Sequence, residues 1–308
     1  MKDLRDIVGT KYPIIQGGMA NIATHKLAAA VSNAGGLGLV GAGGWDVVRV
    51  RDEIRKTKAL TDKPFGVNIM LMSPHAEAIS DMVIEEGIKV ITTGAGNPGI
   101  YMDKWKEAGM IVIPVVPSVA LAKRLERIGA DAVIVEGTEA GGHIGEITTF
   151  TLVPQVSDAV SIPVIAAGGI ADSRGLDAAY ILGARGVQIG TVLLASEECP
   201  VHVNYKNRVV KAKDTDTVVT GRGTGAPVRV IKNKMSRKYL ELTKSGEYDL
   251  KEMEELTLGS LSRAVFNGDM DTGSIMAGQS AGLVKEIRSC KEILEHIYEG
   301  SLVSKGVI

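Results

Sequence analysis

The sequence has few cysteines, few aromatic residues and almost no net charge. Its 308 residues include only two cysteines, Cys199 and Cys290, and neither lies in a CxxC or Cys/His cluster, so we expect no disulfide framework and no metal site. With 35 basic and 36 acidic residues, the formal charge is −1, and no whole-chain field favours nucleic acid or a membrane surface. The longest apolar runs fall short of the roughly 18 residues of a spanning helix. We therefore expect a soluble cytoplasmic protein that binds neither nucleic acid nor membrane.

The apolar residues that are present, 45% of the chain, follow one repeated pattern. Short β-branched runs alternate with longer amphipathic stretches, and the runs are continuously apolar, as expected of parallel strands buried on both faces. Stretches such as residues 119–128 have helical spacing, with Ser118 and Gly129 placed to cap the helix. The eight runs span residues 12–16, 37–40, 65–69, 89–92, 111–115, 132–135, 164–167 and 186–189. The pattern predicts an α/β fold, a closed (β/α)8 TIM barrel, with an open doubly wound sheet as the alternative.

The alternation of strands and helices stops after the eighth predicted strand. We expect residues 1–195 to form the barrel, residues 196–269 a small helical cap over its mouth, and residues 270–308 a C-terminal segment that returns to the barrel. The expected cap contains a basic run, which is either a docking surface for an acidic partner or a solvated helical face. The run consists of Arg229, Lys232, Lys234, Arg237 and Lys238.

A GxGxxG pattern at Gly36, Gly38 and Gly41 resembles a dinucleotide-binding motif. That motif follows a strand and opens a helix, whereas these glycines begin before a predicted strand and run through it. We interpret the pattern as a tight turn from helix to strand.

Glycines also follow predicted strands seven and eight, where TIM barrels often bind a phosphate group. They are Gly168 and Gly169 after one strand, and Gly190 with Thr191 after the next. Glycine permits close approach of the backbone to phosphate oxygens, and the hydroxyl of Thr191 can add a donor. Two such sites in consecutive loops predict a phosphate-binding site.

Polar or glycine-rich residues follow four other predicted strands as well. Taken singly, Asn68 could cap a helix and Glu136 could pair with a lysine. As a set at one barrel face, they predict a flat ligand with polar edges, attached to the phosphate. The set comprises Gly17, Gly18 and Met19 after strand one, Asn68 on strand three, residues 92–94 after strand four, and Glu136 after strand six.

His143 lies in the segment EAGGHIG, residues 139–145, after predicted strand six. A histidine among glycines at the mouth can act as acid, base or hydrogen-bond donor near neutral pH. The contexts of His25, His75, His202 and His296 instead predict solvated surface positions. Met70, Met72 and Met276 suit an adaptable apolar channel, although core packing is the expectation for Met72.

Many of these segments resemble one enzyme family. The strings YPIIQGGMA, GVNIM, TTGAGNP, VVPSVALAKR, EAGGHIG, IAAGGI, VQIGT, GAPVRVIKN and GSIMAGQSAGL, from residue 12 to residue 283, are similar to the flavin-dependent enoyl-[acyl-carrier-protein] reductases. These enzymes belong to the nitronate monooxygenase/2-nitropropane dioxygenase superfamily. AAGGI occurs in many phosphate-binding barrels, but AGGH is more restricted, and the ordered set is highly specific. Residues 220–225, TGRGTG, depart from the pattern, so roles there are the least secure.

The resemblance implies an FMN site with His143 as the active-site histidine. It places Gly17, Gly18 and Met19 against the isoalloxazine ring and Asn68 at its polar edge. The ribityl chain and ring side are assigned to Glu136, Gly141 and Gly142, and the phosphate to Gly168, Gly169, Gly190 and Thr191. Met276, Gly278 and Gln279 would close over the ring.

The implied activity is reduction of enoyl thioesters on acyl carrier protein in fatty acid synthesis. NADH or NADPH would be the reductant, in a ping-pong cycle through FMN, with a homodimer as the assembly and a monovalent cation as an optional further cofactor. His143 would polarise the thioester carbonyl or donate the proton, and the basic run would dock the acidic carrier protein.

Three alternatives differ in chemistry. A nitronate monooxygenase would share the barrel, FMN and histidine but use oxygen without NAD(P)H. An IMP dehydrogenase-like barrel requires a cysteine in the loop after strand six, where this chain has His143. A non-catalytic binding module leaves that histidine unexplained.

Overall fold

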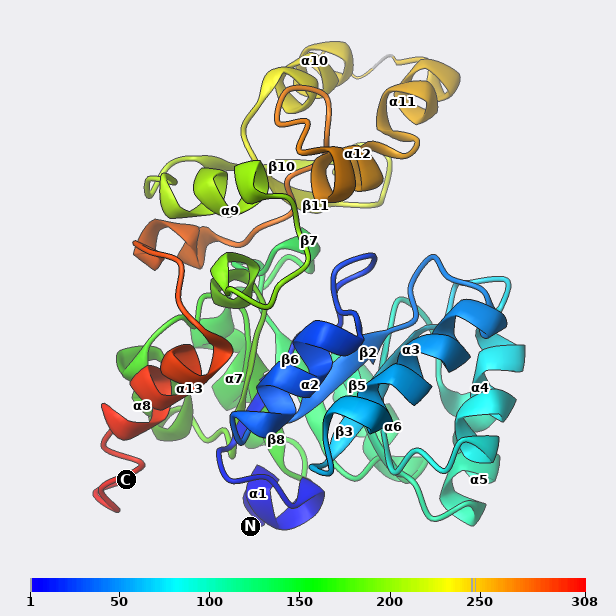
Figure 1. Cartoon of the computed structure of the whole chain (residues 1–308), viewed down its shortest axis with the longest axis vertical. Coiled ribbons are helices and arrows are strands. Elements are labelled where there is room, and N and C mark those ends of the chain that lie inside the picture. The colour runs from blue at the N-terminus through cyan, green and yellow to red at the C-terminus, as the bar shows by residue number, and fades with distance from the viewer. Residues whose placement is uncertain (1, 245, 247) are drawn as a thin grey trace.

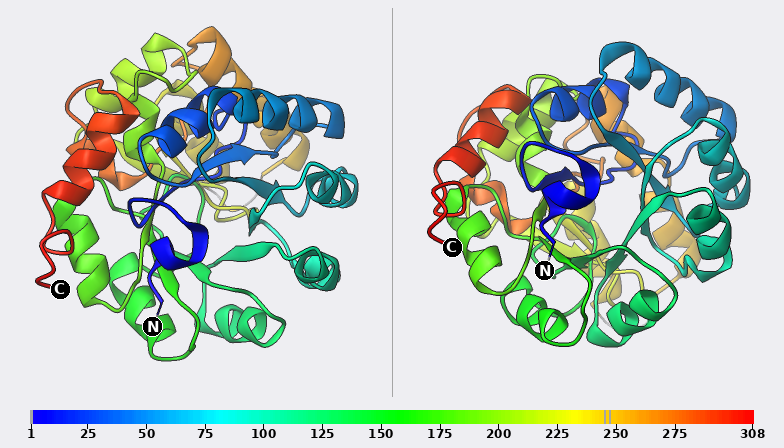
Figure 2. Two further views of the ribbon diagram at one scale, coloured as in Figure 1. Left: turned by 60° about the horizontal axis from the view of Figure 1, so that its bottom comes forward. Right: turned by 90° about the horizontal axis from the view of Figure 1, so that it is seen from below.

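The computed structural model describes the whole chain except residues 1, 245 and 247. Eight parallel strands form one sheet in the order β1-β9-β8-β6-β5-β4-β3-β2. A parallel bridge between Ile15 and Leu37 joins β1 to β2. A side-chain hydrogen bond adds to this contact between β1 and β2, because the Nε2 of Gln16 donates to the Leu39 carbonyl at 2.8 Å. The fold is thus the predicted (β/α)8 TIM barrel, seen from below in Figure 2.

Each predicted strand is present, and its observed ends differ from the expected ones by no more than two residues. Continuous burial of β-branched residues made these strands visible in the sequence. The barrel strands are β1 (Ile14–Gln16), β2 (Gly38–Gly41), β3 (Phe65–Met70), β4 (Val90–Gly94), β5 (Ile111–Val116), β6 (Val133–Glu136), β8 (Val164–Ala167) and β9 (Val187–Ile189).

Helices surround the sheet. They are α1 (Leu4–Val8), α2 (His25–Asn33), α3 (Val47–Leu60), α4 (Ala76–Glu85), α5 (Gly99–Glu107), α6 (Val119–Arg127), α7 (Thr149–Ser157) and α8 (Ser173–Ile181), with α13 (Cys290–Glu299) near the C-terminus. The predicted cap of α6 is present, since Ser118 accepts from the Leu121 N–H and Gly129 has a φ of +97°. The last helix, α13, packs between α8 and α2, the place of a barrel's eighth helix. Tyr298 on this helix lies against Tyr12, with ring centroids 4.7 Å apart.

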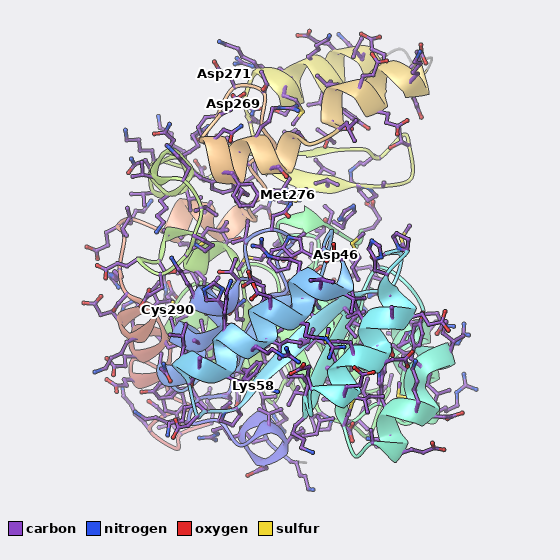
Figure 3. The ribbon with its side chains drawn as sticks, turned by 45° about the vertical axis from the view of Figure 1, so that its right-hand side comes forward. Asp46, Lys58, Asp269, Asp271, Met276 and Cys290 are labelled. Atoms are coloured by element: carbon purple, nitrogen blue, oxygen red, sulfur yellow. The ribbon has the colours of Figure 1, made fainter. Side chains whose placement is uncertain are left out.

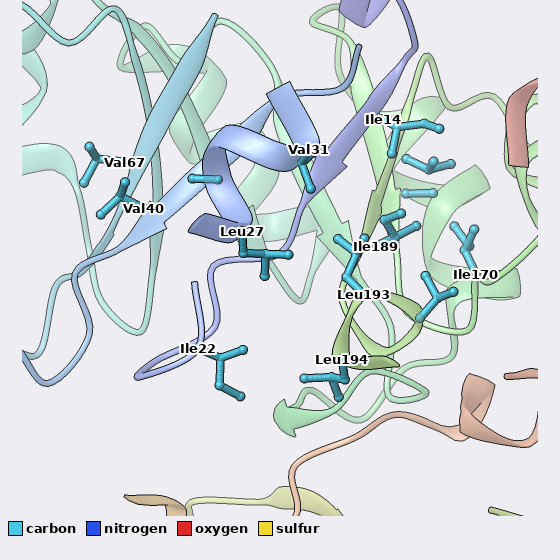
Figure 4. Close-up of a cluster of buried hydrophobic side chains, with 14 of the residues drawn as sticks. Ile14, Ile22, Leu27, Val31, Val40, Val67, Ile170, Ile189, Leu193 and Leu194 are labelled. Carbon is cyan, nitrogen blue, oxygen red and sulfur yellow. The ribbon is translucent and has the colours of Figure 1, made fainter. Parts of the chain in front are cut away.

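The hydrophobic core has two layers because neighbouring strand residues face opposite sides. Ile14 and Val40 face the helices (Figure 4), whereas Ile15 and Leu39 face the barrel interior. The interior layer also includes Leu4 of α1, which lies across the lower end of the barrel in Figure 2. The lower end is therefore closed, and the carboxyl ends of the strands form the accessible mouth.

The GxGxxG pattern lies at the contact between α2 and β2, as the predicted turn requires. A Cβ at Gly38 would overlap the carbonyl of Ala28, so glycine permits the close packing of this helix. The pattern has no nucleotide-binding geometry, because Gly38 and Gly41 are part of the strand itself.

The segment after β9 differs from the expected helical cap. It contains η1 (Thr191–Ala195), α9 (Val203–Val210), α10 (Lys234–Thr243), α11 (Leu250–Thr257), α12 (Ser260–Asn267) and η2 (Gln279–Leu283), but also β10 (Thr217–Thr220) and β11 (Val228–Ile231). These two strands form an antiparallel hairpin that pairs with β7 (Gly142–His143), between barrel and cap in Figure 1. The expected helices are thus present, and the hairpin is an addition that the prediction lacked, formed where β-branched runs flank a glycine-rich turn.

Two further side-chain expectations were wrong. His25 is half-buried, and its Nδ1 lies 2.6 Å from the buried Glu53 carboxylate, so it is not a solvated surface residue. Met72 is 75% exposed rather than packed in the core, because it follows β3 in the loop at the mouth.

Both cysteines are buried and free. No helix among the described residues is long and apolar enough to cross a bilayer.

Candidate active site

The loops after β1 and β9 meet at the barrel mouth. The Gly17 N–H donates to the Ile189 carbonyl at 2.7 Å. A Cβ at Gly190 would lie 3.7 Å from the Met19 sulfur, so this side chain covers the neighbouring loop. The structure thus brings together two of the predicted glycine segments.

The loops after β8 and β9 offer backbone donors to an anion. Ala167 of β8 pairs with Gln188 of β9, so the two loops begin side by side. Gly168 and Gly169 have φ values of +94° and +80°, a conformation that favours glycine. Within the described part of the chain, no acceptor is found for the N–H groups of Gly168, Gly169, Gly190 and Thr191. These free donors fit a single phosphate group.

The C-terminal segment is fixed against the same loops. The Gly278 N–H donates to the Thr191 hydroxyl at 2.9 Å, which leaves the hydroxyl proton available to a ligand. The Gln279 N–H donates to the Glu139 carbonyl at 2.9 Å. A Cβ at Gly141 would lie 2.6 Å from the Ala277 carbonyl carbon. Gly141 therefore serves the packing of these two segments, and a direct ligand contact by it stays a prediction.

Glu139 holds the loop after β6 in place. Its carboxylate accepts the Thr149 N–H at 2.9 Å and lies 3.0 Å from the Thr149 hydroxyl, at the start of α7. The same hydroxyl lies 3.0 Å from the Gly168 carbonyl. One threonine thus links the loop after β6 to the phosphate-site candidate after β8.

Asn68 points toward the mouth from β3. Its Nδ2 donates to the Thr92 hydroxyl at 2.9 Å, so it is not a helix cap. A Cβ at Gly18 would overlap the Asn68 side chain, which therefore lies directly against the exposed loop after β1. This contact leaves the Asn68 Oδ1 as the group that a ligand edge can meet.

Glu136 is half-buried at the end of β6 and has no cationic partner among the described residues. The alternative that it pairs with a lysine is therefore not observed. Burial raises the pKa of its carboxyl group to about 7. Near neutral pH this group can exist in either protonation state, and the neutral acid can donate a hydrogen bond.

Gln188 on β9 is a candidate that sequence reasoning missed. Its neighbours Val187 and Ile189 face the helices, so its own side chain faces the barrel interior. Its Oε1 is buried without a hydrogen-bond partner among the described residues. In the sheet register it is separated from Glu136 only by Ala167. The available signal was one polar residue within a continuous apolar strand.

His143 is exposed on β7, above the barrel mouth. Its backbone pairs with Val228 of β11, and the next N–H, of Ile144, donates to the Pro227 carbonyl at 3.1 Å. Its imidazole makes no hydrogen bond within the described part of the chain, so both ring nitrogens are available. The structure thus places the predicted catalytic histidine on an element shared by barrel and cap.

Met276 lies where the C-terminal segment crosses this junction (Figure 3). It forms an antiparallel bridge with Val230, and its carbonyl accepts the Tyr205 hydroxyl at 2.8 Å. A Cβ at Gly142 would lie 3.6 Å from the Met276 sulfur. The thioether therefore lies beside the strand that carries His143.

The basic run does not form one exposed face. Arg229 is only 7% exposed, and its Nε donates to the Thr138 carbonyl at 3.0 Å. Lys234 forms an ion pair with Asp271 at 2.7 Å, and Lys238 lies 3.7 Å from Glu252. Of the predicted docking residues, Lys232 and Arg237 remain exposed and outside any ion pair between described residues.

Among the solved structures that resemble the chain along its whole length are the two that follow. FabK from Thermotoga maritima is 50% identical with a TM-score of 0.94, and the match covers 100% of both chains. A nitroalkane oxidase from Streptomyces ansochromogenes is 26% identical with a TM-score of 0.87, covering 98% of this chain and 99% of that one.

Related sequences carry other names. A "Probable nitronate monooxygenase" of Staphylococcus saprophyticus is 36% identical over 94% of this chain and 95% of its own. A Mycobacterium tuberculosis protein, named (3aS,4S,5R,7aS)-5-hydroxy-7a-methyl-1-oxo-octahydro-1H-indene-4-carboxyl-CoA dehydrogenase, is 34% identical over 96% and 94%. The family model described as nitronate monooxygenase matches residues 2–300. The chain therefore belongs to the nitronate monooxygenase family and is an oxidoreductase.

Proposed function

We propose that the protein is an FMN-dependent reductase of enoyl thioesters that uses NADH or NADPH. The observation that carries this proposal is the likeness to FabK, 50% identical over the full length of both chains. FabK is the enzyme type that the sequence motifs resemble. The Mycobacterium tuberculosis relative adds support, since its name describes a carboxyl-CoA and hence a thioester.

The hydrogen-bonding groups at the barrel mouth match the phosphate and the polar ring edge of FMN. The free N–H groups around Gly169 and Thr191 suit one phosphate, and Asn68 and Glu136 supply polar contacts for the edge and side of a flat ring. One such anion site supports FMN over FAD, which has two phosphates. When bound, FMN would supply hydride transfer between the two substrates.

His143 would act on the acyl substrate rather than on the cofactor phosphate. Its imidazole is exposed and has no competing hydrogen bond in the described structure, so it can donate to a thioester carbonyl or protonate the α-carbon. Negative charge develops on that carbonyl when a hydride reaches the β-carbon, and a positioned donor stabilises it. Near it, a Cβ at Gly145 would lie 2.9 Å from the Pro117 side chain and one at Gly142 3.6 Å from the Met276 sulfur, so these glycines permit close packing around the histidine.

A second candidate function is nitronate oxidation. The family model and the Staphylococcus saprophyticus relative favour it, and the nitroalkane oxidase shares the fold at 26% identity. The two functions differ in their electron partners, since a nitronate monooxygenase passes electrons to oxygen and needs no nicotinamide.

An anaerobic titration separates the two functions. NADH or NADPH is added to the FMN-loaded protein, followed by crotonyl-CoA, while the flavin absorbance is followed. We expect bleaching by the nicotinamide and recovery on adding the thioester. A flavin that stays oxidised with NAD(P)H, but turns over a nitronate in air, would establish the alternative.

The proposed physiological substrate is an enoyl group on acyl carrier protein, with the protein acting as a homodimer. Within the basic run, Lys232 and Arg237 are best placed to contact an acidic carrier, because they are exposed and form no ion pair with another described residue. Buried Arg229 supports the cap hairpin instead.

A further inference from the structure

The tip of the β10–β11 hairpin, residues 221–227, holds a fixed position beside His143. Val228, the first residue after the tip, pairs with His143 in the sheet. The Pro227 carbonyl accepts the Ile144 N–H at 3.1 Å. The C-terminal end of the tip is therefore attached to the backbone at His143 and at Ile144, the residue that follows it.

The tip is a compact turn with unused donors. Gly221 and Gly225 have φ values of +79° and +77°, and a Cβ at Gly221 would overlap the carbonyl of Ala226. The Ala226 N–H donates to the Gly221 carbonyl at 3.0 Å, which closes the turn. Three consecutive N–H groups have no acceptor among the described residues: those of Arg222, Gly223 and Thr224.

Arg222 directs its guanidinium to Glu146, three residues after His143. The two side chains are 49% and 66% exposed, and such an exposed ion pair contributes little net stability. A guanidinium binds a phosphate through two parallel hydrogen bonds, a stronger arrangement than one exposed carboxylate contact. A phosphate group can therefore replace Glu146 as the partner of Arg222.

A second guanidinium lies nearby. Arg229 is buried between the Thr138 carbonyl, 3.0 Å away, and the Thr217 hydroxyl, 3.2 Å away. It forms no ion pair with a carboxylate of the described residues. Burial, and next the charge of Arg222, lowers the pKa of Arg229, so the two cations are close enough to repel. An additional anion at the tip would relieve this repulsion.

We propose that the hairpin tip binds the phosphate ester in the tail of the substrate, with Arg222 exchanging Glu146 for the phosphate. This inference rests on the proposed function. Both proposed substrates combine a reacting carbon, which must reach the mouth beside His143, with phosphate groups further along the molecule. The phosphate comes either from the dinucleotide or from the pantetheine arm of the thioester.

Substitution of Arg222 by glutamine in the FMN-loaded protein tests this site. Half-reactions are measured with NADPH, with crotonyl-CoA and with crotonyl-N-acetylcysteamine, which lacks phosphate. We expect roughly tenfold weaker binding of at least one phosphate-bearing substrate and unchanged use of the N-acetylcysteamine thioester. Weaker NADPH binding identifies the dinucleotide as the source, and weaker crotonyl-CoA binding identifies the pantetheine arm.

Matched variants separate the site from general charge and folding effects. Lys211→Gln removes an exposed cation at the end of α9 and should change none of these constants. Glu146→Gln removes the competing carboxylate and should tighten the affected substrate by about two- to threefold. Arg222→Lys should retain part of the affinity, with FMN content and Tm as checks of folding. Equal effects of Arg222→Gln on all three substrates, or none, would overturn the proposal.

A binding measurement separates failure of this site from failure of the proposed function. Inorganic pyrophosphate is titrated calorimetrically into the FMN-loaded wild-type and Arg222→Gln proteins. Pyrophosphate binding that is lost in the variant supports the tip site even if NADPH never reduces the flavin. Equal binding, or no binding, by both proteins overturns the site while leaving the reductase assignment intact.

Discussion

At the barrel mouth, side chains and N–H groups are placed by neighbouring parallel strands, whereas His143 and Arg222 are placed by an antiparallel hairpin of the cap. The mouth elements are joined side by side, as the bond from Gly17 to Ile189 shows. The cap reaches the barrel through β7 and through the bridge from Val230 to Met276. Under the proposed function, cofactor binding would fall to the mouth built by the parallel strands, and substrate handling to the antiparallel sheet of β7, β10 and β11.

The largest effect is expected from a substitution in the proposed phosphate site of the barrel mouth. Gly169→Asp forces a side chain into a φ of +80° and places a negative charge beside the unpaired N–H groups. We expect the purified protein to lose most of its FMN, measured by flavin absorbance after denaturation.

Gly225→Asp is the matched change on the cap side. Its φ of +77° imposes similar backbone strain, and a Cβ there meets no atom within 4 Å. FMN content should remain close to that of the wild type. Full occupancy in both variants would remove the loop after β8 from the cofactor site.

The second largest effect is expected from removing the imidazole of His143 on β7. His143→Ala should keep FMN and its reduction by NAD(P)H, because the imidazole contacts no barrel residue through a hydrogen bond. Oxidation of reduced flavin by enoyl thioester should slow by about 10²–10⁴-fold. Stopped-flow spectroscopy measures both half-reactions on one preparation, with exposed His75→Ala as the control. Loss of flavin or equal impairment of both steps would indicate a structural role.

The third effect concerns stability at the mouth. Burial raises the pKa of Glu136 to about 7 in the folded protein, above the usual 4.5. Between these values the folded state binds more protons than the unfolded state, so the stability of the cofactor-free protein falls as pH rises.

Glu136→Gln should remove about 1–2 kcal/mol of this pH dependence, a value reduced for partial exposure. Urea unfolding at about pH 5 and about pH 8 measures it. The exposed Glu77→Gln on α4 is the control and should leave the pH dependence unchanged. An unaltered slope in the Glu136 variant would mean that this carboxyl is solvated in the protein.

The smallest effect tests the outer face of the cap. Reversing the charges of Lys232 and Arg237 should raise KM for carrier-bound substrate by about three- to tenfold and leave crotonyl-CoA unaffected, with the difference shrinking in salt. Lys234→Glu alone should do less, because Asp271 already pairs with this lysine. Equal losses on both substrates would place carrier docking elsewhere.

The barrel could be predicted from the sequence because burial on both faces makes each parallel strand a continuous apolar run. The same logic located the glycine loops after β8 and β9. The cap hairpin was missed because its strands pair antiparallel and follow another pattern. The strand β11 supports His143 by pairing with β7, which is far from it in the sequence. The spacing of residues within either segment does not predict this pairing. Gln188 was overlooked because strand periodicity alone does not show which polar residue lacks a partner.

The position of α13 has a consequence for synthesis of the chain. This helix fills the gap between α8 and α2 and packs Tyr298 against Tyr12, yet it is translated only after the whole cap. A growing chain therefore leaves one flank of the barrel uncovered until the cap has been translated. The long segment between β9 and α13 must be ordered before this helix can dock, and ordering it costs conformational entropy. Until then the exposed flank of the barrel can aggregate or bind a chaperone.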